Sequence, residues 1–382
     1  DIFTRLQESC HDHLNLEPAL NVELHHLPMG SDQAQSPIQM YPHRAEGIDY
    51  LLQLAARTKR SYDIIHSHYW LSGLMALELR QHWDVPVVQM FHTLGHMKNR
   101  VALSETQRDP IIRLEAEQMI INSANTIIAA TPAERTQLLW LYRANIHTIT
   151  VVPPGVDTNR FKPTSKIEAN RAIGLNETTR MLLYVGRIEP LKGIDTLIRA
   201  IAALMNSNNE ILRDLSVVVI GGDAGLIDEE DQEMRRLRHL CSELGLNGLI
   251  TFAGARGQDE LPNYYVSAEA VIMPSHYESF GMVALESMAT GTPVIASEVG
   301  GLAYLIQDGI TGFHVPDRDP EELAGKIRLL LENRELRNEM GAAAVKYAQA
   351  YSWSHIADDI EKVYQATLAQ HLNSKKAGYG TL

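Results

Sequence analysis

The sequence predicts an α/β protein made of two doubly wound parallel sheets that face each other across a cleft. Short apolar runs rich in β-branched residues alternate with longer amphipathic segments, as in parallel strands joined by crossover helices. The length of 382 residues exceeds one ordinary hydrophobic core, so two domains are expected. Pro and Gly cluster at residues 153–163, where they oppose helix and central strand, and the alternation restarts after them.

In the first half, strands and helices alternate as expected for one such sheet. Residues 1–5 resemble the end of a strand, so we expect part of the natural chain to precede Asp1. Further strands are predicted at 62–66, 85–91, 126–130 and 148–152. Helices are predicted at 44–59, 71–82, 110–123 and 132–142. Asp109 and Thr131 each precede a proline and are expected to cap the last two helices.

The second half repeats the alternation. Strands are predicted at 181–186, 216–221, 249–252, 270–274, 293–296 and 312–315. Asp317 and Asp319 match an Asp-x-Asp metal motif, but Pro320 and a helical pattern follow, so a turn or helix cap is the better interpretation. No metal site is therefore predicted. Residues 374–382 are expected to fray.

The composition argues against several classes of function. The formal net charge is −13 and no run of Lys or Arg offsets it, so nucleic acid is not an expected partner. Only Cys10 and Cys241 are present, which favours neither a disulfide framework nor a zinc site and suits a reducing cytoplasm. The longest apolar runs have strand length, far below the roughly 20 residues that span a bilayer, so no integral membrane segment is expected.

The sharpest local motif is the segment 274–286, in which a strand end leads into a predicted helix. Glu278 and Glu286 stand eight positions apart, so we expect both carboxylates on one helix face along the cleft. The free amides at the helix start would favour a phosphate. The alternative is that Glu278 is a first-turn acid favoured by the helix dipole and Glu286 a surface residue.

Two further motifs follow predicted strands. In segment 186–193, Arg187 offers a planar fork and Lys192 a point charge for a diphosphate, although a solvated loop would have the same composition. His66, His68 and His92 stand at strand ends in the first half, where histidine suits sugar hydroxyls. A metal pair from His66 and His68 lacks a nearby carboxylate, and structural histidines are the favoured alternative.

Other fingerprints are absent from the sequence. Residues 221–225 do not fit Gly-x-Gly-x-x-Gly, and no Gly-x-x-x-x-Gly-Lys-Ser/Thr occurs, so dinucleotide dehydrogenases and P-loop enzymes lose support. Gly-x-Ser-x-Gly is missing too, which argues against an α/β-hydrolase.

The order and spacing of these motifs resemble family 4 of the retaining glycosyltransferases, whose GT-B fold has two Rossmann-like domains facing a cleft. The resemblance covers nearly the whole chain through the motifs at 63–73, 91–95, 152–157, 186–193, 278–286 and 300–301. It is closest to the branch of sucrose-phosphate synthases and the inositol-phosphate N-acetylglucosaminyltransferases of mycothiol synthesis. In this family a first strand and a Gly-rich loop come earlier, which the resemblance places before Asp1.

The resemblance also implies the domain limits. Residues 1–155 would form the acceptor-side domain and residues 156–350 the domain that binds the nucleotide sugar. A helix at 351–372 resembles the one that crosses back to the first domain, so the domains are not strictly sequential.

The family resemblance implies a donor site in the second domain. Arg187 and Lys192 would bind the diphosphate, Glu286 the ribose hydroxyls and Glu278 the hydroxyls of the donor sugar. His92 would contact this sugar near the reacting carbon. The adjoining backbone amides implied to take part are those of Phe280, Gly281, Met282 and Val283. The residues implied in catalysis are His92, Glu278, Arg187 and Lys192.

For the acceptor, the resemblance implies a phosphate held by three residues. Tyr69, Thr93 and Arg113 match the family positions that bind an acceptor phosphate. A Lys that several relatives place between their second and third strands has no counterpart at 29–43. The acceptor is therefore expected to be a hydroxyl compound, with a phosphorylated sugar or cyclitol as one candidate.

The implied reaction is hexosyl transfer from a UDP-sugar, with glucose or N-acetylglucosamine as the sugar and with retention of configuration. In the family, an oxygen of the departing phosphate is thought to deprotonate the acceptor on the same face, and Arg187 and Lys192 would stabilise the leaving group. No cofactor is expected beyond the UDP-sugar co-substrate, and no motif indicates Mg²⁺. A cytoplasmic enzyme, with peripheral membrane binding and a homodimer left open, fits this picture.

Two other functions remain open at the level of the sequence. A UDP-sugar 2-epimerase also has two facing Rossmann-like domains and would convert its sugar nucleotide without an acceptor. An inactive nucleotide-binding homologue is the alternative that is not an enzyme.

Overall fold

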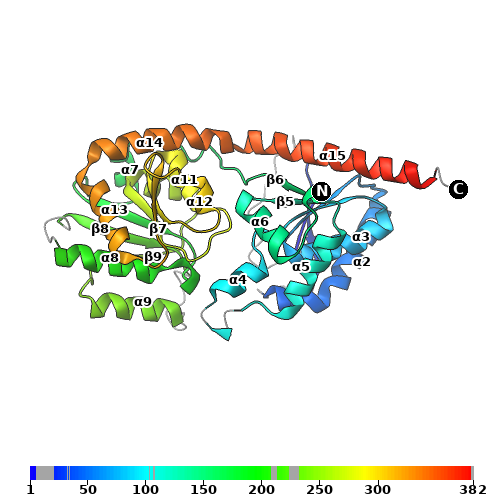
Figure 1. Ribbon diagram of the computed structural model, residues 1–382, viewed down its shortest axis with the longest axis horizontal. Coiled ribbons are helices and arrows are strands. Elements are labelled where there is room, and N and C mark those ends of the chain that lie inside the picture. Colours follow the sequence, from blue (N-terminus) through cyan, green and yellow to red (C-terminus); the bar gives the residue numbers. More distant parts are fainter. Residues whose placement is uncertain are drawn as a thin grey trace.

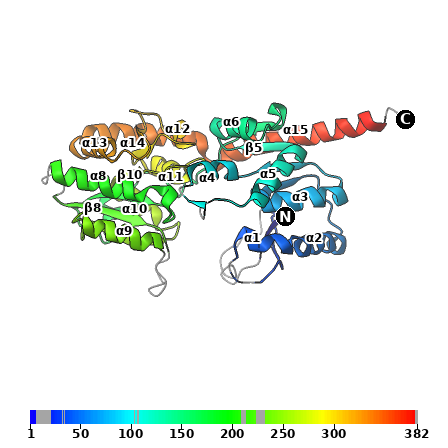
Figure 2. The same cartoon turned by 60° about the horizontal axis from the view of Figure 1, so that its bottom comes forward.

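The computed structural model describes residues 1–5, 21–31, 33, 35–102, 104–105, 108–207, 213–222 and 232–379. Two α/β domains lie side by side, and one long C-terminal helix reaches from the second domain along the first (Figure 1). The same separation is visible when the molecule is turned (Figure 2). The predicted fold class of two Rossmann-like parallel-sheet domains is confirmed. Cys10 and part of segment 221–225 lie outside the described residues.

The first domain is built on a parallel sheet in the order β3-β4-β5-β6. Its strands are β3 (Ile65–His68), β4 (Val87–Met90), β5 (Thr126–Ala129) and β6 (Ile149–Val151). Its helices are α1 (Pro37–Met40), α2 (Arg44–Thr58), α3 (Tyr69–Trp83), α4 (Gly95–Val101), α5 (Ile111–Ser123) and α6 (Pro132–Leu141). A separate parallel pair joins β1 (Ile2–Arg5) to β2 (Leu24–Leu27), so the strand expected at the start of the sequence is present.

The second domain holds a larger parallel sheet in the order β12-β11-β10-β7-β8-β9. Its strands are β7 (Arg180–Val185), β8 (Leu215–Ile220), β9 (Ile250–Gly254), β10 (Ala268–Met273), β11 (Val294–Ser297) and β12 (Gly312–Val315). Its helices are α7 (Lys166–Ala172), α8 (Ile194–Ser207), α9 (Gln232–Glu243), α10 (Leu261–Ser267), α11 (Met282–Thr290), α12 (Leu302–Leu305), α13 (Pro320–Glu332) and α14 (Arg334–Ala348). The order reverses beside β7, which is where such sheets bind ligands.

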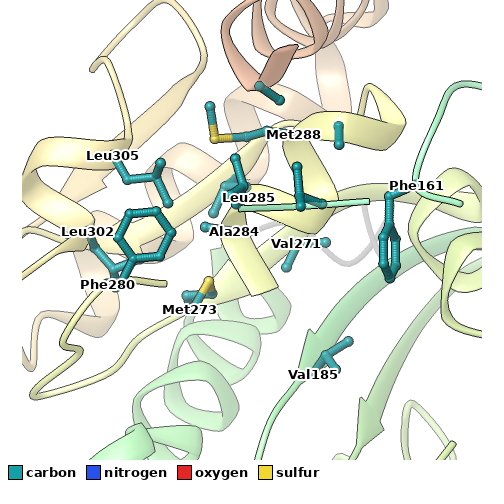
Figure 3. Packing of buried hydrophobic residues seen from close by; sticks show 14 of the residues in the cluster. Phe161, Val185, Val271, Met273, Phe280, Ala284, Leu285, Met288, Leu302 and Leu305 are labelled. Atoms are coloured by element: carbon teal, nitrogen blue, oxygen red, sulfur yellow. The ribbon is translucent and has the colours of Figure 1, made fainter. Parts of the chain in front are cut away.

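Helix α11 lies in the core of the second domain, which explains why it is apolar almost all round. Ala284, Leu285 and Met288 have no exposed surface. They pack with Val271 and Met273 of β10 and with residues of α12 (Figure 3). Truncation of Leu285 to Ala is therefore expected to cost about 2–5 kcal/mol. This burial fixes the helix start, and with it the loop that enters the cleft.

The C-terminal helix α15 (Trp353–Tyr379) is joined to the first domain by side-chain contacts. Tyr364 Oη lies 2.7 Å from Nδ1 of His66, and the hydroxyls of Thr367 and Thr126 are also 2.7 Å apart. Lys375 pairs with the Asp84 carboxylate at 2.6 Å. The sequence predicts fraying from residue 374 onward. This prediction is wrong for residues 374–379, because helix α15 continues to Tyr379. Residues 380–382 lie outside the described part of the chain.

The predicted helix caps were right in two cases of three. The Thr131 and Asp319 side chains accept hydrogen bonds from the amides of Glu134 and Glu322. Asp109 does not cap α5, because Pro110 takes the cap position and the Asp109 carboxylate turns to Arg113.

Candidate active site

A cavity of about 480 Å³ lies at the carboxyl ends of β7 and β10 and is lined by both domains. The first domain contributes His92 and Thr93 from the segment after β4. The second domain contributes the loop after β7 and the loop before α11. The predicted site residues that line this cavity are His92, Thr93, Arg187, Lys192, Glu278, Phe280, Gly281, Met282 and Val283. Clefts at this edge of parallel sheets are usual ligand sites.

Lys192 and Glu278 form the central polar contact of the cavity. Lys192 Nζ donates to Glu278 Oε2 at 2.6 Å, and both side chains are less than one fifth exposed. The two loops that carry them meet closely, since the amide of His276 donates to the carbonyl of Leu191. Gly193, at φ 62°, makes this approach possible, because a Cβ there would lie 2.0 Å from the Pro274 carbonyl oxygen.

The side chain of Arg187 is far more exposed than that of Lys192. Its side chain is 72% exposed and pairs with Glu189 at 2.5 Å. The Tyr184 hydroxyl donates to the Arg187 carbonyl and so holds the backbone, while the guanidinium stays at the rim of the cavity. Arg187 can therefore swing toward an anion without leaving a buried partner behind.

Glu278 lies before the helix, so the expectation that both glutamates share one helix face is wrong. The helix starts at Met282, because Gly281 at φ 111° turns the chain out of the helical conformation. The Glu278 carbonyl accepts from the amide of Gly301 at 2.8 Å. A Cβ at Gly300 would approach that same carbonyl oxygen to 2.0 Å, so a glycine is needed there.

The start of α11 leaves backbone donors without partners. No side chain caps this helix, and no acceptor in the described part of the chain takes the amides of Met282 and Val283. Both residues line the cavity, as Phe280 and Gly281 do. Unpaired amides at a helix start attract anions.

Glu286 lies one turn into α11 and is not among the residues that line the cavity. Its Oε2 accepts a 2.7 Å hydrogen bond from the Tyr265 hydroxyl, and the residue is 9% exposed. Burial raises the pKa of Glu286, while the hydrogen bond from Tyr265 opposes this shift. Its role toward a ribose stays a prediction.

Three histidines form a row in the first domain that ends at the cavity. The rings of His66 and His68 stack at 4.3 Å, and Nδ1 of His68 lies 2.9 Å from Nε2 of His92. Burial among protein atoms lowers the pKa of His66 to about 3 and of His92 to about 4, so both rings are neutral near pH 7. His92 has φ 62°, an uncommon conformation that functional sites often hold.

The metal alternative for His66 and His68 gains no support from this arrangement. Their rings stack and bond to Tyr364 and His92. Within the described ranges, three potential ligands converge only at Asp1 and Glu23, which directly precede β1 and β2, and His25 of β2.

The three predicted acceptor residues come together around Arg113, which is 1% exposed. Its Nη1 donates to the Tyr69 hydroxyl and to Asp109 at 2.9 Å, and its Nη2 donates to the Thr93 carbonyl and hydroxyl. Its Nε donates to Glu117 at 2.8 Å. A guanidinium has five N–H groups, so all the donors of Arg113 are occupied.

The sequence interpretation missed the two carboxylates on Arg113. Asp109 and Glu117 stand four residues before and after Arg113, the spacing that joins neighbours on a helix. Glu117 has no exposed surface and also accepts from the amide of Gly95 and the Tyr142 hydroxyl. The i±4 acids were the signal that could have indicated this network.

Glu134 is a second buried acid that the sequence interpretation missed. Its Oε2 accepts from the amide of Ala130, a residue that lines the cavity. Burial raises its pKa to about 7. The pattern Thr131-Pro-Ala-Glu134 resembles a capping box in sequence, but the Glu134 carboxylate accepts from the amide of Ala130, one residue before the N-cap Thr131.

None of the helices in the described ranges combines the length and the hydropathy needed to cross a bilayer.

Comparisons with known proteins show the family to which the chain belongs. Residues 6–160 match the model of Glycosyltransferase Family 4, and residues 165–347 match Glycosyl transferases group 1. A D-inositol 3-phosphate glycosyltransferase from Nocardioides sp. is 36% identical over 97% of this chain and 81% of its own length. The enzyme of that name from Nocardia farcinica is 37% identical over 92% of this chain and 76% of its own length.

Solved structures agree with the fold. Sucrose-phosphate synthase from Thermosynechococcus elongatus superposes with a TM-score of 0.85 at 29% identity, over 96% of this chain and 88% of that one. HepE from Anabaena, solved with UDP and glucose, has a TM-score of 0.71 at 21% identity, over 90% and 86% of the two chains, and shows the shared fold. The chain belongs to family 4 of the glycosyltransferases, with the GT-B fold, and is a hexosyltransferase-type enzyme.

Proposed function

We propose that the protein moves glucose or N-acetylglucosamine from a UDP-sugar to a hydroxyl acceptor with retention of configuration. The observation that carries this proposal is the Lys192–Glu278 pair beside the unpaired amides of α11, in a cavity lined by both domains. A cation next to free amides suits a diphosphate, and an adjacent carboxylate suits sugar hydroxyls. No metal or cofactor takes part in the proposal.

Before a donor binds, Lys192 and Glu278 neutralise each other. An incoming diphosphate competes for Lys192 and accepts hydrogen bonds from the amides of Met282 and Val283. Glu278 is then released to accept hydrogen bonds from the sugar. The site thus exchanges an internal ion pair for two contacts to the donor, which limits the desolvation penalty of either charge.

In the proposed transfer, the bond between the anomeric carbon and the diphosphate oxygen breaks as the acceptor oxygen bonds to that carbon on the same face. The departing phosphate oxygen takes the proton of the acceptor hydroxyl. Negative charge grows on the leaving diphosphate, so Lys192 and the exposed Arg187 stabilise the transition state more than the bound donor. Neutral His92 can exchange hydrogen bonds with a sugar hydroxyl without adding a charge near the reacting carbon.

The acceptor in the proposal is a phosphorylated cyclitol or sugar. The relatives named D-inositol 3-phosphate glycosyltransferase support this class. Because the five donors of Arg113 are occupied, an acceptor phosphate has to displace a partner. Asp109 is the partner at the more open end, with 15% of its side chain exposed against none for Glu117, and Lys98 lies 3.6 Å from it.

Titration calorimetry with UDP tests the donor half of the proposal. The wild-type protein is expected to bind UDP, and Lys192→Ala to bind it at least about tenfold more weakly, because a charged contact to phosphate is lost. Lys326→Ala, on α13 outside the cavity, is the matched control. A wild-type protein that does not bind UDP would refute the donor assignment.

Substitutions of Glu278 and Glu286 test the separate roles proposed for them in donor binding. Glu278→Gln is expected to lower kcat without weakening UDP binding, because it removes the carboxylate that competes for Lys192, whereas Glu286→Gln is expected to weaken UDP binding. The reverse pattern would mean that the two roles are exchanged. Retention is checked separately, by NMR of the anomeric proton of the product formed from an α-linked donor.

A further inference from the structure

A second cavity lies at the amino-terminal ends of central strands of the second sheet, opposite the carboxyl ends that meet the donor cavity. Its volume is about 810 Å³, and it is lined by the start of β10, the loop before β11, the start of α7 and the face of α14 from Arg334 to Val345. The donor cavity meets the amino end of α11, whereas this one meets the carboxyl end, at Thr290 and Gly291. The proposed transfer reaction uses none of its residues.

The lining of this second cavity carries more positive than negative charge. Lys166, Arg334 and Arg337 line it together with one carboxylate, Glu269. Glu269 accepts from Lys166 at 2.9 Å and from Arg337 at 2.7 Å, so one acid is shared by two cations. Three cations against one carboxylate leave a local charge of +2, in a chain whose formal net charge is −13.

Arg334 is the cation that remains without a partner. It is exposed at the first position of α14 and makes no ion pair or hydrogen bond with any described residue. Burial lowers the pKa of Arg337, and the nearby charges of Arg180 and Arg334 lower it further against the opposing effect of Glu269. The guanidinium groups therefore repel one another, and an added anion would relieve that repulsion.

Backbone hydrogen bonds fix the position of Arg337 among the cations of the second cavity. Nη1 of Arg337 donates to the carbonyls of Leu330 and Leu331 at the end of α13, which orients its guanidinium. Thr164 and Asn338 line the same cavity, and the side chain of neither has a hydrogen-bond partner in the described part of the chain. Their side chains are thus available as neutral donors to a ligand.

We propose that this cavity binds a phosphorylated small molecule with at least two negative charges. Arg334 and Arg337 would grip a phosphate through their N–H groups, Lys166 would add a point charge, and Thr164 and Asn338 would complete the contacts. The volume is that of a metabolite site and far exceeds a single ion. The proposal stands independently of the donor and acceptor assigned to the first cavity.

Calorimetry with inorganic pyrophosphate tests this site. Pyrophosphate also resembles the diphosphate of a donor, so the titrations are made in the Lys192→Ala protein, where the first cavity has lost its lysine. Binding is expected to persist there and to weaken at least about tenfold when Arg334→Glu is added, since an attractive charge becomes repulsive. Arg328→Glu, an equal charge change at an exposed position of α13 outside the cavity, is expected to change affinity less than about twofold.

Several outcomes would overturn the proposal. They are the absence of pyrophosphate binding in Lys192→Ala, an affinity unaffected by Arg334→Glu, or an equal loss in the Arg328→Glu control, which would reveal a general charge effect. A folding defect is not expected, because Arg334 is exposed and an acid suits the first turn of a helix. In a thermal melt at the same pyrophosphate concentration, the Tm of Lys192→Ala should rise by more than the Tm of the variant that also carries Arg334→Glu.

Discussion

The two sides of the active-site cleft differ in how completely their charged and polar groups are paired. On the side of the second domain, Lys192 has one partner, Arg187 is largely exposed and the first amides of α11 are unpaired. On the side of the first domain, Arg113 is buried with all five donors in use. The donor side is therefore ready for a ligand, whereas the acceptor side is a closed network that a ligand must rearrange.

The largest effect is expected where the buried network is broken. Arg113→Ala leaves Glu117 buried without its cation, so the free energy of unfolding should fall by about 3–5 kcal/mol. Urea unfolding at neutral pH measures this loss. Arg100→Ala, at an exposed position of α4, is the control and should change the free energy by less than about 0.5 kcal/mol. A loss below about 1 kcal/mol for Arg113→Ala would remove the contrast between the two sides.

The donor side should respond in activity and hardly in stability. Lys192→Ala is expected to lower kcat by about 10²–10³, because a group that stabilises the leaving charge is removed. Its ion pair with Glu278 is partly exposed, so the free energy of unfolding should change by less than about 1 kcal/mol. Release of the nucleoside diphosphate and urea unfolding give the two readouts. A stability loss as large as that of Arg113→Ala would contradict the distinction.

Buried Glu134, on the side of the first domain, is expected to make stability depend on pH. Burial raises its pKa from 4.5 to about 7, so between these values the folded protein keeps a proton that the unfolded chain releases. Its stabilisation is complete below pH 4.5 and is lost as the pH rises through 7. Relative to the wild type, Glu134→Gln should therefore gain up to about 3 kcal/mol of stability between pH 5 and pH 8. Urea unfolding measures the stability of both proteins at pH 5 and pH 8. The same stability difference at both pH values would contradict a neutral Glu134.

The smallest effect concerns the one carboxylate that a ligand is expected to displace. Asp109→Asn removes a competing negative charge from Arg113, so the KM for a phosphorylated acceptor should fall by about tenfold. The KM for the same acceptor without its phosphate is the internal control and should stay constant. If both values change alike, Asp109 positions the loop and does not select the acceptor.

The same contrast explains how much the sequence could predict. The donor loops follow single strands, so short motifs such as 186–193 contain both the turn and its cations, and these residues do line the cavity. The start of α11 was misjudged because Gly281 turns the chain before the helix, a conformation that residue spacing does not reveal. The Tyr265 hydroxyl on Glu286 comes from another helix and had no local signal.

The acceptor side depends more on contacts between distant segments. Tyr69, Thr93 and Arg113 were identified by resemblance, but their mutual hydrogen bonds join α3, the segment after β4 and α5. His66 bonds to Tyr364, which lies 298 positions away along the chain. Such pairs follow from the packing of whole elements, and no spacing rule within a motif can anticipate them.

Because helix α15 comes last in the sequence and yet contacts the first sheet, the order of synthesis matters for assembly. The partners of Tyr364 and Thr367 on β3 and β5 lie 298 and 241 positions earlier in the chain, so they leave the ribosome on the order of 12–60 s earlier at usual rates of translation. During that interval the first domain lacks two of its contacts. The nascent chain can therefore complete both halves of its cleft only after the last helix has emerged.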